Sequence, residues 1–127
     1  MPIIYKILMS GHLIHSIAEG KVSKQNFIDY EIQHARDENL KAPVSELFEI
    51  RNGAFDNISK EDIKNILDAR NNNSSFIRHK CALVVSMNDH KGWDLAKFYE
   101  NLMMLHQPAS VIVFGDIKTA KIWLGIK

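Results

Sequence analysis

Two short runs of apolar residues constrain the fold of this chain more than any other feature. Cys81–Val85 and Val111–Phe114 contain no polar residue that alternates with the apolar ones. A strand with one face in water alternates, whereas a strand that is apolar at every position is covered on both faces. Such strands belong to sheets with helices on both sides. The sequence therefore predicts an α/β fold.

Helical patterns separate these strands and follow them. Ser59 and Asp62 resemble a capping box, which predicts a helix start there. A further helix is expected from about Trp93 to His106, where apolar residues recur at helical spacing. A last helix is expected between Asp116, as its N-cap, and Gly125, as its C-terminal stop.

The N-terminal part reads as a hairpin, a helix and a third strand. Ile3–Met9 and His12–Ala18 are rich in β-forming residues, and Ser10–Gly11 supplies the turn. Ser23 is the expected N-cap of the first helix, and Glu46–Arg51 is the expected third strand. The element order is thus ββαβαβαβα. Right-handed crossovers predict a mixed five-stranded sheet with parallel C-terminal strands, an antiparallel edge from the hairpin, and four flanking helices.

Length and composition predict one ordinary globular domain over residues 1–127. Hydrophobic residues make up 46% and charged residues 24%, and no linker or repeat divides the chain. Asn71–Ser75 is expected to be a surface loop. The net charge of +1 is too weak to suggest nucleic acid or an anionic membrane surface as a partner.

Cysteine use and hydropathy predict a cytoplasmic protein. Cys81 is the only cysteine, so no internal disulfide can form, as suits a reducing compartment. Its apolar surroundings predict a buried, inert thiol. No apolar run approaches the roughly 20 residues that cross a bilayer, so no membrane insertion is expected.

The usual motifs of catalysis and cofactor binding are missing. His12 and His15 lie three apart on a strand and so point to opposite faces, and no cysteine pair supports zinc. The six glycines form no phosphate-binding or dinucleotide loop, and no nucleophile elbow surrounds a serine. We therefore expect neither a metal nor a cofactor, and we assign no catalytic residue.

Polar residues near the ends of two predicted strands are the best candidates for ligand binding. Glu49 lies between two apolar residues and needs a partner, which favours an ion pair over a catalytic acid. The segment 86–93 follows a parallel strand, where open α/β sheets bind ligands, although a solvated loop anchored by tryptophan is an alternative. The candidate ligand-binding residues are Glu49, Arg51, Asp89, His90, Lys91 and Trp93.

The carboxyl edge of the parallel strands is the predicted place of a site. Each loop there leads into a helix N-terminus, where free backbone amides favour anionic or strongly polar groups. Asp89, Asp94 and Asp116 could instead occupy those amides as caps.

Met104 suggests a second kind of contact. It aligns with Lys97, Glu100 and Asn101, the polar side of the predicted third helix. An apolar residue on that side predicts either a homodimer contact through this helix or a single exposed side chain.

Four stretches of the chain, together with the element order, match the pattern of a known family: Glu19–Ser23, Leu47–Arg51, Lys80–Val85 and Val113–Asp116, the last followed by Ala120, Trp123 and Leu124. In these features the chain resembles the SpoIIAA-like (STAS-like) family of small, mostly uncharacterised bacterial proteins. The likeness covers nearly the whole chain and implies a single SpoIIAA-like domain. In relatives this fold serves phosphorylation-controlled protein binding or, in the CRAL-TRIO-like branch, binding of apolar ligands.

One segment departs from the anti-sigma-factor antagonists of this family. They carry an Asp-x-Ser-Gly type segment before the second helix, whereas here no glycine follows Ser59. We therefore expect Ser59 to be a helix cap and not a phosphorylation switch.

Three functions remain open from the sequence. We expect a non-catalytic binding or regulatory module that holds a protein partner or a small ligand. The main alternative is a small enzyme whose acid–base residues converge at the carboxyl ends of the parallel strands, with Glu49, Arg51, Asp89 and His90 as its first candidates. The third is an apolar-ligand binder, which needs an enclosed apolar cavity beside the third helix.

Overall fold

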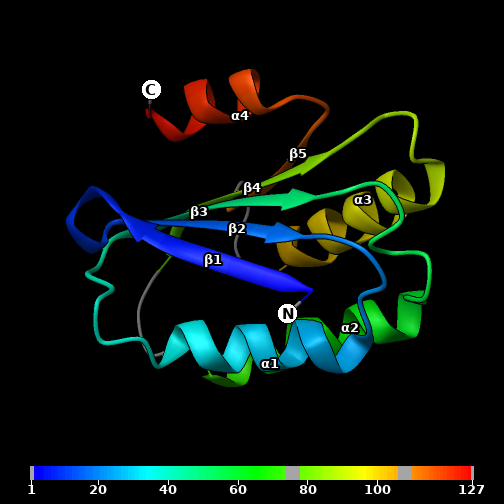
Figure 1. The fold of residues 1–127 in the computed structure, drawn as a ribbon, viewed down its shortest axis with the longest axis horizontal. Coiled ribbons are helices and arrows are strands. Elements are labelled where there is room, and N and C mark those ends of the chain that lie inside the picture. The colour runs from blue at the N-terminus through cyan, green and yellow to red at the C-terminus, as the bar shows by residue number, and fades with distance from the viewer. Residues whose placement is uncertain (1, 74–77, 106–109, 127) are drawn as a thin grey trace.

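A five-stranded sheet separates one helix from three in the computed structural model of this chain (Figure 1). The structure describes residues 2–73, 78–105 and 110–126. Helix α4 lies on one face of the sheet, and α1, α2 and α3 lie on the other. Among the described helices, none combines the length and apolar character that a bilayer crossing requires.

The strands follow one another across the sheet in chain order, β1-β2-β3-β4-β5. β1 pairs with β2 in antiparallel fashion, and β2 to β5 are mutually parallel. The predicted mixed sheet with an antiparallel edge is therefore confirmed. The strands are β1 Ile3–Leu8, β2 Leu13–Ala18, β3 Val44–Ile50, β4 Arg78–Val85 and β5 Val111–Phe114.

The helices begin at polar caps, as their sequences predict. The hydroxyl of Ser23 accepts a hydrogen bond from the backbone of Asn26, whose side chain accepts one in return. Asp116 accepts from the backbone of Thr119, and Gly125 ends the last helix in a left-handed conformation. The helices are α1 Lys24–Ala35, α2 Lys60–Asn73, α3 His90–Met104 and α4 Ile117–Leu124, with a 3₁₀ turn at Met9–Gly11.

Several predicted boundaries were wrong. β3 begins at Val44, directly after the Ala42–Pro43 peptide. The predicted loop 71–75 is helical as far as Asn73, because α2 continues there, and residues 74 and 75 lie outside the described residues. α3 begins at His90 instead of Trp93, since Asp89 provides its cap.

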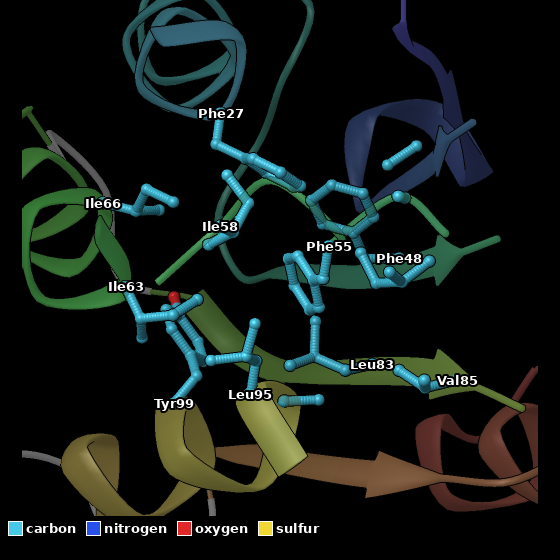
Figure 2. Close-up of a cluster of buried hydrophobic side chains, with 14 of the residues drawn as sticks. Phe27, Phe48, Phe55, Ile58, Ile63, Ile66, Leu83, Val85, Leu95 and Tyr99 are labelled. Atoms are coloured by element: carbon cyan, nitrogen blue, oxygen red, sulfur yellow. The ribbon is translucent and has the colours of Figure 1, made fainter. Parts of the chain in front are cut away.

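The main core lies between the sheet and α1, α2 and α3. Figure 2 shows its aromatic and aliphatic side chains pointing into this space from both layers. The rings of Phe27 and Phe55 are 5.3 Å apart and join α1 to the loop after β3. Cys81 is buried in this core, as predicted. A smaller core under α4 contains Leu13, Leu47, Ala82, Ala120 and Leu124.

The polar side of α3 is less polar than its sequence predicts. Glu100 is buried and accepts a hydrogen bond of 2.6 Å from the backbone N–H of Val113. Lys97 reaches the other oxygen of Glu100 at 2.6 Å. Glu100 therefore fixes α3 to β5, whereas Met104 does lie in solvent, with 52% of its surface exposed.

Replacing Ser59 tests the start of α2. The Ser59 hydroxyl accepts from the Asp62 N–H at 3.1 Å, and the Asp62 carboxylate accepts from the Ser59 N–H at 3.0 Å. We expect Ser59→Ala to lower the free energy of unfolding by roughly 0.5–2 kcal/mol, and Ser59→Asp to keep most of it. Denaturant unfolding of the three proteins measures this. Equal midpoints for Ser59→Ala and the parent would contradict the cap.

Replacing Met104 tests the predicted dimer contact. A glutamate at an apolar contact between two copies would be buried with its charge, so Met104→Glu should shift the protein to the mass of one chain. Sedimentation equilibrium of the variant and the parent measures this. An identical monomeric mass for both proteins removes the dimer hypothesis.

Candidate functional site

A groove of about 520 Å³ lies at the carboxyl edge of the parallel strands. Its walls come from segments that follow four different strands: Glu19 after β2, Arg51 and Asn52 after β3, Ser86 after β4, and Gly115 and Asp116 after β5. The crossovers collect these segments because parallel strands end at the same edge. The groove therefore lies where the sequence predicts a site.

Glu49 and Arg51 line this groove and belong to a chain of polar contacts on the face of the sheet that α4 covers. The Oε2 atom of Glu49 lies 2.6 Å from Nε2 of His15 on β2. Its other oxygen lies 3.4 Å from the guanidinium of Arg51. The ion-pair interpretation of Glu49 therefore describes its surroundings, and His15 is an additional partner that the sequence alone did not reveal.

The groove carries more negative than positive charge. Glu19, Glu49 and Asp116 line it together with a single cation, Arg51, among its described residues. The backbone hydrogen bond from Thr119 holds the pKa of Asp116 below its usual value, so this carboxylate is charged at neutral pH. The charge balance favours a ligand with a cationic group.

Aspartates cap two of the helix N-termini at this edge. Asp116 occupies the first turn of α4, and Asp89 accepts from the backbone N–H of Gly92 at 3.0 Å in the first turn of α3. The capping alternative is correct for these two residues. Asp94 lies inside α3 and is not its cap.

The other four candidate residues lie around the start of α3, apart from Glu49 and Arg51. The second oxygen of Asp89 accepts from the N–H of Gly53 at 3.2 Å and so ties the loop after β3 to this helix. The ammonium group of Lys91 donates to the carbonyl of Asp56 in the same loop. His90 is exposed, and Trp93 packs against the main core. These contacts join the loop after β3 to the start of α3 and give Asp89, Lys91 and Trp93 a structural role.

A buried polar network lies within the main core, and the sequence did not predict it. Glu46 of β3 is fully buried, and its two oxygens contact two helices. Tyr30 of α1 donates to one oxygen at 2.5 Å, and Arg70 of α2 donates to the other at 3.3 Å. Arg70 also donates to the hydroxyl of Tyr99 on α3 at 3.0 Å. Burial raises the pKa of Tyr99, so its phenol remains protonated and can accept this bond.

Three residues of this region offer the ligand types of a metal site. One atom each from Glu31, His34 and Glu46 lie within 4.8 Å of one another. Nδ1 of His34 lies 2.7 Å from the carbonyl oxygen of Tyr30, and it must be the donor in that bond. Both oxygens of Glu46 already accept hydrogen bonds, and the Arg70 guanidinium supplies positive charge beside it. We therefore interpret the cluster as a hydrogen-bonded network.

A small cavity adjoins this network inside the main core. Its volume is about 30 Å³, which holds one or two water molecules. Its lining is mostly apolar but includes Glu31, Glu46, Arg70 and Tyr99. This cavity beside α3 is far smaller than a lipid chain, so it gives no support to the apolar-ligand alternative.

The sequence held weak signals for these residues. Arg70 continues the apolar face of α2 after Ile63, Ile66 and Leu67, and a cation on a buried face needs a buried anion. Glu46 lies near the start of a strand, where an exposed charge is common. Only the packing of α2 against β3 in the folded chain shows that Arg70 and Glu46 contact each other.

Comparison with protein-family models, curated proteins and solved structures finds no match for this chain. The candidate site is therefore inferred from the geometry of this chain alone.

Replacing Arg70 tests the buried network. Arg70→Met removes the guanidinium from a fully buried carboxylate, so we expect a loss of roughly 3–5 kcal/mol in the free energy of unfolding. Lys64→Met, on the exposed side of the same helix, is the control and should change it by less than about 0.5 kcal/mol. Denaturant unfolding measures both. Similar midpoints for the two variants would show that the network adds little.

Proposed function

We propose that this protein is a non-catalytic binding or regulatory module of the SpoIIAA-like kind, which holds a small polar ligand or a partner's side chain in the carboxyl-edge groove. The observation that carries the proposal is the groove itself, with walls from the ends of four strands. Ligands of open α/β sheets bind at this edge. The likeness in element order and in the segments Leu47–Arg51 and Val113–Asp116 supports the family assignment.

The chemistry of the groove favours a ligand that carries a cationic group. Three carboxylates surround the space, and Arg51 already lies beside one of them. An ammonium or guanidinium group would meet charge-assisted acceptors there. The nearby apolar residues Ile50, Val84 and Ile117 would cover the rest of a small ligand.

The pair of His15 and Glu49 favours a second candidate function, that of a small acid–base enzyme. Their 2.6 Å contact orients an imidazole on the groove's side of the sheet. A positioned histidine is the commonest general acid or base. Asp89 and His90, whose residue types also suit acid–base chemistry, are a helix cap and an exposed residue of α3, so they do not converge with Glu49.

A ligand screen followed by a variant tests the binding proposal. Thermal shift against small amines and guanidinium compounds, with matched carboxylates as controls, should give stabilisation by the cationic set only. Glu49→Gln should weaken binding of a hit about tenfold, because one carboxylate charge is lost. Glu61→Gln, an exposed carboxylate on α2, is the matched control and should bind as the parent does.

Amide chemical shifts decide where the hit binds. Shifts should gather at the groove-lining residues 49–52, Val84, Ser86 and 115–117. Shifts confined to the hairpin 3–18 would contradict the proposed groove. Conversion of the hit into a product, lost in His15→Gln while binding persists, would favour the enzyme.

A further inference from the structure

The register of the opening hairpin determines which backbone groups of β1 face outward. The N–H of Glu19 donates to the carbonyl of Pro2 at 2.9 Å, so these residues form a hydrogen-bonded pair. Hydrogen-bonded pairs alternate along an antiparallel ladder. The next ones in this register are Ile4 with Ile17, Lys6 with His15, and Leu8 with Leu13. Ile3, Tyr5 and Ile7 therefore turn their N–H and C=O groups away from β2.

This outer edge of β1 is open in the described part of the chain. The sheet ends at β1, and β2 is the only described strand that pairs with it. Figure 1 shows β1 at one edge of the sheet, beside α1. Exposed edges are usually blocked by a proline, a bulge or an inward charge, because their free backbone groups can pair with another strand. None of the three outward residues is a proline, and their register with β2 is regular.

A groove of about 480 Å³ runs along this edge. Ile3, Tyr5 and Ile7 form one wall, and residues from the end of α1 and the loop after it form the other. The three outward residues span about 13 Å at a rise of about 3.3 Å per residue. The residues of the second wall are Gln33, Asp37 and Asn39.

The groove has one fixed negative charge. The backbone N–H of Asn39 donates to Asp37 and holds the pKa of that carboxyl below its usual value. The hydroxyl of Tyr5 donates to the second oxygen of Asp37 at 2.9 Å. This ties the carboxylate to β1 itself, next to the outward backbone groups. A strand added here would pass the carboxylate of Asp37.

We propose that the outer edge of β1 binds an extended segment of a partner polypeptide as a sixth strand, with a lysine or arginine of that segment beside Asp37. The outward N–H and C=O groups supply affinity for any extended backbone, and the helix-walled groove selects its side chains. This site is at the opposite edge from β5 and is independent of the carboxyl-edge groove.

Charge argues against a second copy of this chain as the occupant. Two β1 strands related by a two-fold axis at Tyr5 would place their Tyr5 side chains directly opposite each other, about 5 Å apart at Cβ. Each tyrosine holds an Asp37 carboxylate, so two like charges would meet on the same face of the sheet. A basic partner segment would instead place a positive charge beside the negative carboxylate of Asp37.

Three peptides of defined chemistry test this edge. The probe is a capped heptapeptide of alternating lysine and valine. One analogue replaces each lysine with glutamate, and another replaces each valine with proline, which removes backbone donors. With the lysine–valine peptide, amide shifts should gather at Ile3, Tyr5 and Ile7, and the exchange of these amides should slow at least tenfold. The two analogues should bind at least tenfold more weakly.

Two variants separate backbone pairing from simple charge attraction. Ile7→Pro removes an outward N–H and leaves the ladder to β2 in place, so it should weaken the peptide at least tenfold, whereas Ile7→Val should not. Asp37→Asn should reduce the preference for the lysine peptide over the glutamate peptide. Circular dichroism and unfolding midpoints confirm that each variant is folded.

Several outcomes would overturn the proposal. These are the absence of shifts at the β1 edge, equal binding by Ile7→Pro and Ile7→Val, and shifts confined to residues 49–52 and 115–117. The last would show that the basic peptide binds the carboxyl-edge groove. A dimer of the free protein that Ile7→Pro dissociates would show that a second copy occupies the edge.

Discussion

The buried carboxylate of Glu46 is the centre of a hydrogen-bond network that spans five elements of this structure. It lies on β3 and accepts from Tyr30 on α1 and from Arg70 on α2. Arg70 in turn contacts Tyr99 on α3, and the hydroxyls of Tyr30 and Ser16 are 2.5 Å apart. One network therefore joins two strands to all three helices of the main layer. Because a buried charge is costly without its partners, it fixes how these helices are placed relative to the sheet.

The sequence predicts the architecture well because its signals are local. The apolar runs at 81–85 and 111–114 identify buried strands, and they became β4 and β5. Ser23 and Asp116 identify helix starts, since a capping side chain contacts a backbone group only three residues away. The error at the end of α2 has a different cause, because no local signal gives it. The sequence of Asn71–Asn73 has turn-like composition, yet α2 continues through it, so tertiary context overrides a weak propensity there.

The sequence predicts the location of the site, because this follows from the topology of the sheet, but it does not predict which side chains meet there. Parallel strands fix a common edge, and the groove with Glu49 and Arg51 lies at that edge. The structure does not bring the other four candidates, Asp89, His90, Lys91 and Trp93, into this groove. They lie at the start of α3, which covers the face of the sheet opposite to α4. The contact of His15 with Glu49 depends on the register between β2 and β3, which no pattern along the chain encodes. The same holds for Glu46 and Arg70, which are 24 residues apart.

Part of the carboxyl-edge groove is formed by α4, the helix that covers the smaller of the two cores. α4 supplies Ile117 to the wall, and only Ala120 and Leu124 of this helix are buried. The ammonium group of Lys80 reaches the carbonyl of Trp123 at 2.6 Å and lies 4.8 Å from the centre of its ring, which fastens the other end of the helix. Elements with few buried contacts open at lower free energy than the rest of a protein. Detachment of α4 would remove one wall of the groove and leave the main core intact, so the shape of the groove depends on the local stability of α4 as well as on the stability of the whole domain.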